Sequence, residues 1–190
     1  AARVNFATAD AEGRITDRRA GRIPTERCGE LCERLGDIKI PGVQTFIRPV
    51  KDYRAVVVFR GQGLNDRVKD TDPQATGVKP LSPKPSAPEG KKTAEVAGEF
   101  VRQALTRLQD QQPANTVLMR GFALLPHIPS LKERFLLDGL ALAVYPDYKG
   151  VSRLVGMEIV DGLQSLDDQA AALKEHWGRH DFFFVHHKYT

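Results

Sequence analysis

The chain has 190 residues and an ordinary globular composition, with 41% hydrophobic and 27% charged residues. This length is enough for one sizeable core, or for one domain plus part of another. The net charge of +4 is mild, and no block of Lys and Arg resembles a nucleic-acid-binding arm. No run approaches the ~18 apolar residues of a membrane span, and the N-terminus shows no signal segment. We therefore expect neither nucleic acid nor a membrane as a partner.

The two cysteines, Cys28 and Cys32, lie four positions apart in a stretch with helical spacing of apolar residues. This arrangement suits two thiols in a hydrophobic core better than a disulfide. We expect a cytoplasmic location, because the reducing cytoplasm keeps thiols reduced.

The first region, residues 1–62, is predicted to be a sheet with a helix on one face. Gly13 lies where a hairpin turn needs positive φ. Pro24 and Gly36 stand near the start and after the end of the expected helix. The predicted elements, in chain order, are strands at 4–8 and 14–17, a helix at 28–35, and strands at 44–48 and 55–59.

The remainder of the chain is predicted to mix helices and strands, which indicates an α/β fold. Residues 70–92 hold five prolines and form the clearest irregular segment. Ser130 and Glu133 have the spacing of a capping box. The predicted elements after the irregular segment are a helix at 96–108, a strand at 116–119, a short helix after Ser130, a buried strand at 140–145, a helix at 166–178 and a buried strand at 182–185.

Arginine-bearing segments recur along the chain and are its main functional signal. Arg recognises carboxylates and phosphates with a planar fork of donors. Arg120 and Lys149 each follow an apolar strand, where the ligand sites of α/β proteins lie. Arg18 and Arg19 are neighbours on a predicted strand, so at most one of them faces a given site. The pattern predicts a small anionic substrate held by several donors.

Four further polar residues have more than one interpretation. Asp70 and Asp72 precede Pro73, so they are either turn residues or site residues. His186 and His187 follow each other on a predicted strand. We interpret these two as site-wall or core histidines rather than as metal ligands.

A series of motifs in order along the chain points to a known family. The motifs are Asn5-Phe6-Ala7-Thr8, Asp17-Arg18-Arg19-Ala20-Gly21-Arg22, Arg54-Ala55-Val56, Arg60-Gly61, Asp70-Thr71-Asp72-Pro73, Lys92-Thr93-Ala94, Pro113-Ala114-Asn115, Arg120-Gly121, Lys149-Gly150-Val151, Arg153-Leu154-Val155-Gly156-Met157 and Val185-His186-His187-Lys188. The series resembles the archaeal-type 2,3-bisphosphoglycerate-independent phosphoglycerate mutases of the alkaline phosphatase superfamily. Where that family commonly has a His before the Arg-Ala-Val stretch, this chain has Tyr53.

The resemblance implies that the chain is an internal part of a longer enzyme. Residues 1–124 would be an inserted substrate-binding domain, a β-sheet with flanking helices. Residues 125–190 would be part of an alkaline-phosphatase-like α/β core. In the family, an Asp-Gly metal-binding segment and a nucleophilic Ser come before this region, and further metal ligands come after it. We therefore expect no catalytic residue and no metal ligand in this chain, which would be inactive by itself.

The implied reaction is a phosphoryl shift between the 2- and 3-oxygens of glycerate through a phosphoserine. The intact protein would use two divalent ions, chosen from Mn, Mg, Co and Zn. Two other functions remain open: a non-catalytic anion-binding or regulatory domain, and another phosphotransfer enzyme of the superfamily such as a phosphopentomutase. The residues expected to hold phosphoglycerate are Asp17, Arg18, Arg22, Arg54, Arg120, Lys149, Arg153 and Lys188.

Overall fold

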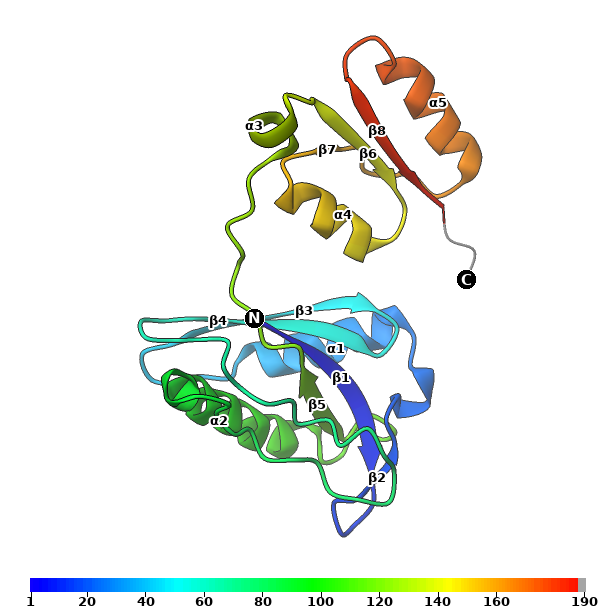
Figure 1. Cartoon of the computed structure of the whole chain (residues 1–190). Coiled ribbons are helices and arrows are strands. Elements are labelled where there is room, and N and C mark those ends of the chain that lie inside the picture. Colours follow the sequence, from blue (N-terminus) through cyan, green and yellow to red (C-terminus); the bar gives the residue numbers. More distant parts are fainter. Residues whose placement is uncertain (188–190) are drawn as a thin grey trace. The chain divides into compact units, whose positions relative to one another are not determined.

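The computed structural model describes residues 1–187 and divides the chain into two compact units (Figure 1). Unit 1 is Ala1–Leu125, and unit 2 begins at Pro126. The boundary expected from the sequence lies one residue earlier. Both units combine sheet and helix, so the predicted mixed α/β class is confirmed. The functional labels given to the two domains stay predictions.

Unit 1 contains a five-stranded antiparallel sheet with two long helices packed on one face. β1 is central, because it pairs with three other strands. The elements are β1 (Ala2–Ala9), β2 (Ile15–Asp17), η1 (Ala20–Arg22), α1 (Thr25–Gly36), β3 (Gln44–Lys51), β4 (Arg54–Arg60), η2 (Pro88–Gly90), α2 (Lys91–Leu108) and β5 (Thr116–Arg120).

The core of unit 1 lies between this sheet and the helices α1 and α2. Each helix buries one apolar stripe at spacings of three and four residues, as the sequence predicts. Phe100 of α2 meets Phe59 of β4 edge to face, with ring centres 5.6 Å apart. The sheet residues that face the helices are Val4 and Phe6 of β1, Val57 and Phe59 of β4, and Val117 and Met119 of β5.

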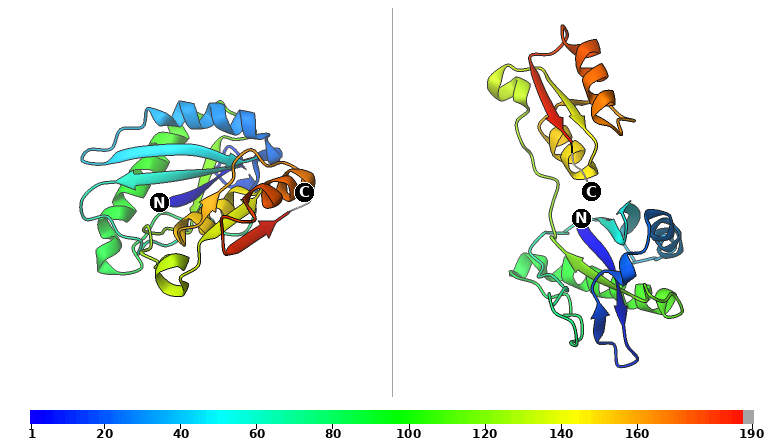
Figure 2. Two further views of the ribbon diagram at one scale, coloured as in Figure 1. Left: turned by 90° about the horizontal axis from the view of Figure 1, so that it is seen from above. Right: turned by 90° about the vertical axis from the view of Figure 1, so that its right-hand side faces the viewer.

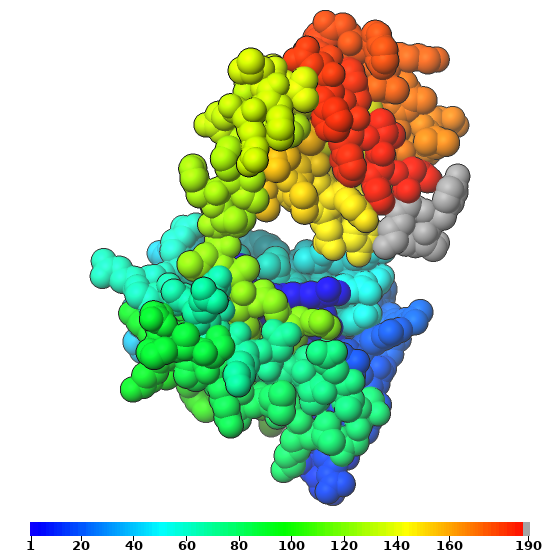
Figure 3. Space-filling model, in the orientation of Figure 1, coloured from blue at the N-terminus to red at the C-terminus, as the bar shows by residue number. Residues whose placement is uncertain are grey.

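The long segment between β4 and α2 has no helix or strand other than η2, which agrees with its proline content. It is nevertheless tied to the sheet. The Thr71 N–H donates to the carbonyl oxygen of Met119 at 2.8 Å, and the Met119 N–H donates to Thr71 Oγ1 at 2.7 Å. The residues beside Thr71 are therefore held along β5. The segment forms a broad part of the unit 1 surface visible in Figure 3.

Unit 2 contains a three-stranded parallel sheet in the order β7-β6-β8, flanked by helices (Figure 1 and Figure 2). Leu140 and Leu142 of the buried central strand β6 pack against Ala172 of α5. Buried Gln169 of α5 donates to the carbonyl oxygens of Leu142 and His186, and so ties β6 to β8. The elements are α3 (Leu131–Phe135), β6 (Gly139–Ala143), α4 (Pro146–Leu154), β7 (Glu158–Ile159), α5 (Leu166–His176) and β8 (Phe182–His186).

Three expectations for unit 2 are corrected. The predicted burial of β8 is wrong, because Phe182 and Val185 are 41% and 45% exposed on a strand that pairs only with β6 among the described residues. Helix α5 is present, but its buried side chains are Gln169 and Ala172, whereas Trp177 of the predicted apolar face is exposed. Helix α4 is not predicted from the sequence. Within residues 1–187, no helix combines the length and apolar character that crossing a bilayer requires.

Candidate anion-binding site

The face of the unit 1 sheet turned away from the helices carries arginines from three neighbouring strands. Side chains alternate along a strand, so the residues between Ala2, Val4 and Phe6 of β1 point to this face. They are Arg3, which is exposed, and Asn5, which is 7% exposed. The register places Arg3 beside Arg120 of β5 and Asn5 beside Arg54 of β4. Arg3 Nε donates to Asn5 Oδ1 at 3.2 Å. These arginines and Asn5 are called the arginine face below.

A fourth guanidinium, that of Arg18, joins the arginine face through the carboxylate of Asp72. Arg18 donates from Nε and Nη2 to the two carboxylate oxygens, at 3.0 and 2.8 Å. The Gln74 N–H donates to Asp72 at 2.9 Å, and Arg120 Nη1 lies 3.7 Å from Oδ2. The Asp72 side chain is 1% exposed, whereas those of Arg18 and Arg120 are 31% and 37% exposed. One buried carboxylate therefore holds two half-exposed cations.

The charges of this cluster shift two pKa values. Burial would raise the pKa of Asp72, but the hydrogen bonds from Arg18 and the Gln74 N–H, with the charges of Arg18 and Arg120, outweigh burial and lower it. The pKa of Arg18 is raised, chiefly by its hydrogen bond to Asp72, with a smaller contribution from Tyr53. The pair is therefore ionised at neutral pH, and Tyr53 lies near it.

Arg54 is also held before any ligand binds. Its Nη1 lies 3.1 Å from a carboxylate oxygen of Asp52, and its guanidinium carbon lies 4.5 Å from the centre of the Tyr53 ring. Its Nε is buried and has no hydrogen-bond partner among the described residues. A buried donor without a partner is costly, and the Arg54 side chain as a whole is 26% exposed.

The turn after β2 is held by Asp17. Its two carboxylate oxygens accept the N–H groups of Arg19 at 2.8 Å and Gly21 at 2.6 Å. The backbone φ is positive at Ala20, Gly21 and Arg22 in succession, with values of 48°, 62° and 55°. This conformation costs a residue with a Cβ about 1–2 kcal/mol, and such strain is concentrated at functional sites. Arg22 is exposed, without a described hydrogen bond or ion pair of its side chain within residues 1–187.

In unit 2, Lys149 and Arg153 lie one turn apart on α4 and both pair with Asp161. The nitrogen-to-oxygen distances are 3.0 and 3.3 Å. The hydrogen bond and charge of Lys149, with a smaller contribution from the charge of Arg153, outweigh burial and lower the pKa of Asp161. Tyr148 stacks on His186, with ring centres 3.7 Å apart. These residues lie at or after the carboxyl ends of the parallel strands, the edge where α/β proteins bind ligands.

The structure thus gathers five of the predicted site residues in two places. Arg18, Arg54 and Arg120 share the arginine face of unit 1, and Lys149 and Arg153 share a carboxylate in unit 2. The predicted site residue Lys188 lies outside the described residues. Substrate contact by each of these residues, and by Asp17 and Arg22, stays a prediction.

Three arguments made from the sequence are corrected. Arg18 and Arg19 lie in a turn, not on a strand, because β2 ends at Asp17. Arg120 ends a strand of an antiparallel sheet, so the argument from the ligand edge of parallel sheets does not apply to it. Lys149 lies inside α4 rather than directly at a strand end.

Sequence reasoning missed two residues of the cluster, Arg3 and Asn5, and left Asp72 open between a turn residue and a site residue. The alternation of Arg3 and Asn5 with Val4 and Phe6 is a signal that could have placed both polar residues on the open face. Asp72 accepts a hydrogen bond within its own turn, which fits one of the two interpretations, but it also pairs with an arginine 54 positions away. No local pattern in the sequence indicates that long-range contact.

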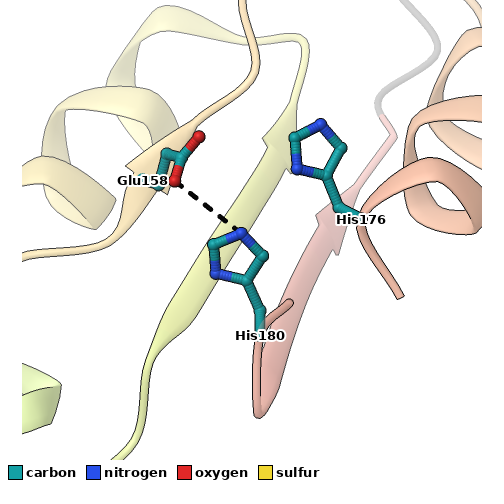
Figure 4. A group of neighbouring side chains, drawn as sticks. All are labelled: Glu158, His176 and His180. Atoms are coloured by element: carbon teal, nitrogen blue, oxygen red, sulfur yellow. Dashed lines mark ion pairs between the residues drawn. The ribbon is translucent and has the colours of Figure 1, made fainter. Parts of the chain in front are cut away.

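One group of metal-ligand side chains is found among residues 1–187, and it consists of Glu158, His176 and His180 in unit 2 (Figure 4). The sequence analysis does not anticipate it. A ligand set for two neighbouring divalent ions is not found among these residues. The pair of ions implied by the resemblance therefore does not fit the described part of the chain, and no chemical step is derived through it.

The fold and the clustered arginines describe an α/β protein with a surface suited to small anions. A family model described as 2,3-bisphosphoglycerate-independent phosphoglycerate mutase matches residues 1–115. The chain belongs to this family, as the order of its motifs predicts.

Relatives agree over the whole chain. A protein of Aquifex aeolicus named "Probable 2,3-bisphosphoglycerate-independent phosphoglycerate mutase" is 41% identical, over 100% of this chain and 49% of its own length. A protein of Thermus thermophilus with the same name is 40% identical, over 100% of this chain and 48% of its own length. The solved structure of the cofactor-independent phosphoglycerate mutase of Thermoplasma acidophilum matches with a TM-score of 0.74 and 29% identity, over 97% of this chain and 53% of that one. The chain spans about half the length of these relatives.

Proposed function

We propose that the chain is the substrate-holding part of a phosphoglycerate mutase that interconverts 3-phosphoglycerate and 2-phosphoglycerate through a phosphoserine in the cytoplasm. The observation that supports this most is the arginine face with Arg18 and Asp72. We place the nucleophilic serine and the ligands of two divalent ions in the half of the protein that this chain does not cover. The reaction assigned to the whole protein rests on the family to which the chain belongs.

The charge balance of the arginine face favours an anionic ligand. Four guanidinium groups, from Arg3, Arg18, Arg54 and Arg120, have two carboxylates as partners, so positive charge is in excess. Phosphoglycerate carries a carboxylate and a phosphoryl group, and a planar guanidinium binds either with two parallel hydrogen bonds. Charge-assisted hydrogen bonds contribute about 1.5–3 kcal/mol each when water is excluded.

The buried pair of Arg18 and Asp72 gives one of these donors a fixed orientation. Arg18 uses Nε and Nη2 to bind Asp72, which leaves Nη1 and its N–H groups free for a ligand. A guanidinium held in this way loses little conformational entropy when substrate binds. Glycerate must reorient between the two phosphoryl transfers without leaving, and fixed donors on several strands are suited to holding it.

Lys149 and Arg153 of unit 2 would bind substrate by exchanging the carboxylate of Asp161 for substrate oxygens. Lys149 and Arg153 are paired with Asp161, so they would bind substrate oxygens only by giving up part of that contact. The Lys149 side chain is 17% exposed, which limits its access to a ligand more than that of Arg153. Lys188 is kept as a proposed phosphate contact because of the motif in which it lies.

Binding is tested by NMR titration of the 190-residue chain with 3-phosphoglycerate. We expect millimolar or weaker binding, with shifts at Arg3, Asn5, Arg54 and the end of β5. Arg54→Ala and Arg120→Ala should abolish the shifts. Arg102→Ala is the matched control, because Arg102 is exposed on α2 and its side chain pairs with Glu99 alone within residues 1–187. Shifts confined to other regions, or unchanged in both arginine variants, would remove the site from the arginine face.

Catalysis is tested in the full-length protein with an enolase-coupled assay. Arg120→Ala should lower kcat/KM by about 10²–10³, in line with the loss of one preorganised charge. Arg120→Lys should recover only part of this, because an ammonium makes no two-pronged contact. Arg102→Ala should be unaffected, and melting temperatures should show that all variants fold. Phosphoglycerate binding without turnover in the full-length protein would favour a regulatory domain instead.

A further inference from the structure

Three ligand-type side chains converge at the amino ends of the unit 2 strands (Figure 4). Glu158 is the first residue of β7, His176 is the last residue of α5, and His180 lies in the connection that leads into β8. Glu158 pairs in register with Leu140, near the start of β6, which confirms that the group lies at this edge. Three separate segments of the chain therefore meet at one point.

The distances within the group are short enough for shared coordination after small side-chain movements. One ligand atom from each residue lies within 4.8 Å of the others. Nε2 of His180 lies 3.7 Å from Oε2 of Glu158, and the two imidazole rings are 5.8 Å apart between centres. Around a tetrahedral zinc ion at about 2.0–2.2 Å from each ligand, the ligand atoms approach one another further.

Burial supplies a second, independent observation. The side chain of His180 is 8% exposed and that of His176 is 15% exposed. The Nδ1 atoms of both rings are buried and have no hydrogen-bond partner among the described residues. A buried polar atom without a partner is unfavourable, so it calls for a specific explanation. Metal binding supplies one for His176, whereas Nδ1 of His180 faces the carboxylate of Asp138 at 4.0 Å.

A further carboxylate lies behind His180. Oδ1 of Asp138 is 4.0 Å from Nδ1 of His180, on the other side of the ring from Glu158. Histidine ligands of metals commonly donate their second ring N–H to a carboxylate, which fixes the tautomer and the ring orientation. His180 between Glu158 and Asp138 has the partners that this arrangement needs.

We propose that Glu158, His176 and His180 form a binding site for a divalent transition metal of the zinc class. Two imidazole nitrogens and one carboxylate oxygen suit Zn²⁺, Co²⁺ or Ni²⁺, whereas Mg²⁺ and Ca²⁺ prefer oxygen ligands. The Glu158 side chain is 60% exposed, so a water molecule can complete the coordination.

The role of this site is structural. A bound ion would link α5, β7 and the entry to β8. The buried apolar core shared by β6 and α5 is small, with Leu140, Leu142 and Ala172 as its buried members. A ligand that binds only the folded state stabilises it by mass action. Metal binding should therefore raise the melting temperature of unit 2.

The test is titration of the purified 190-residue chain, stripped of metal, with Zn²⁺ by calorimetry and with Co²⁺ by visible absorption. We expect one ion per chain, Co²⁺ bands typical of nitrogen and oxygen ligands, and a higher melting temperature followed by Trp177 fluorescence. His176→Gln and His180→Gln should each weaken binding at least tenfold, and Asp138→Asn should weaken it about 10–100-fold without removing a ligand. Mg²⁺ should have no such effect.

The matched control is His127→Gln, because His127 is exposed and lies outside the group. It should bind Zn²⁺ as the parent chain does. Circular dichroism of each variant without metal shows whether it folds. If a histidine variant does not fold, Asp138→Asn, which keeps all three ligands, still tests the site. Absence of binding, or equal binding in the parent chain and both histidine variants, would overturn the proposal. A thiolate charge-transfer band with Co²⁺ would assign the ion to cysteines instead.

Discussion

Replacing Asp72 by Asn should destabilise unit 1 through the pair with Arg18. An amide can keep one oxygen for Arg18 Nε and the Gln74 N–H, but it places an NH₂ group 2.8 Å from Arg18 Nη2. One charge-assisted hydrogen bond is lost, and Arg120 loses its anionic partner. Breaking a fully buried pair costs about 3–5 kcal/mol. Because water reaches Arg18, which is 31% exposed, we expect a loss of about 2–3 kcal/mol.

The pH dependence of this loss has a definite sign. The pKa of Asp72 is lower in the folded protein than the ordinary value of about 3.9. Its stabilising contribution is therefore fully present above that value, and it is lost as the pH falls through the lowered pKa. The difference in unfolding free energy between the parent chain and Asp72→Asn should be constant near neutral pH and should shrink below a pH of about 4.

Urea unfolding followed by far-ultraviolet circular dichroism measures the difference, and hydrogen exchange of the β1 and β5 amides assigns it to unit 1. Asp110→Asn is the matched control, because Asp110 pairs with Arg34 at 3.1 Å on the surface and should contribute far less. The reasoning is refuted if Asp72→Asn is no less stable than Asp110→Asn at neutral pH. It is also refuted if the difference grows as the pH falls.

Three further predictions concern packing in unit 1. Gly90→Ala should lower the unfolding free energy by more than about 2 kcal/mol, because a Cβ there would lie 1.8 Å from a backbone carbonyl oxygen. A Cβ at Gly98 inside α2 meets nothing within 4 Å, so Gly98→Ala should raise the unfolding free energy by up to about 1 kcal/mol. Urea titrations measure both changes. The Asn115 amide accepts from the Ala9 N–H and donates to the Ala9 carbonyl oxygen, each at 2.8 Å. A carboxylate cannot donate, so Asn115→Asp should lower stability by about 1–2 kcal/mol in thermal melts. An unchanged melting temperature would contradict this. Cys28 and Cys32 are buried free thiols, and the hydrogen bond with Cys28 and burial raise the pKa of Cys32. Both thiols should therefore resist alkylation until urea unfolds the chain. Rapid labelling of the native protein would contradict their burial.

Much of the fold could be predicted because short-range patterns in the sequence indicate many of its helices and strands. The apolar spacing of α1 and α2, the apolar run of β4 and the capping box of Ser130 and Glu133 each depend on residues only a few positions apart. Helix α4 was missed because Lys149, Gly150 and Arg153 make its sequence look like a polar loop. The exposure of β8 was missed because an all-apolar run looks the same on an edge strand as on a central one.

The candidate site was also predicted only in part from the sequence. Arginine content and the ordered motifs pointed to an anion and to the mutase family, and the family is now shown. Which arginines lie together was not predictable, because Arg18 meets a carboxylate 54 positions away and Arg120 meets Arg3 only through strand pairing.

The sequence by itself determined the helices α1 and α2 with their regular apolar spacing, the strands of unit 1, the burial of the cysteines and the family. Those features follow from short-range steric and hydrophobic preferences, which neighbouring residues express without knowledge of the rest of the chain. The tertiary structure alone decided that Asp72 is a buried anchor for two arginines, and that Glu158, His176 and His180 meet at one edge of a sheet. Both results depend on strand register and loop docking, and these bring together side chains whose charges interact only after the chain has folded.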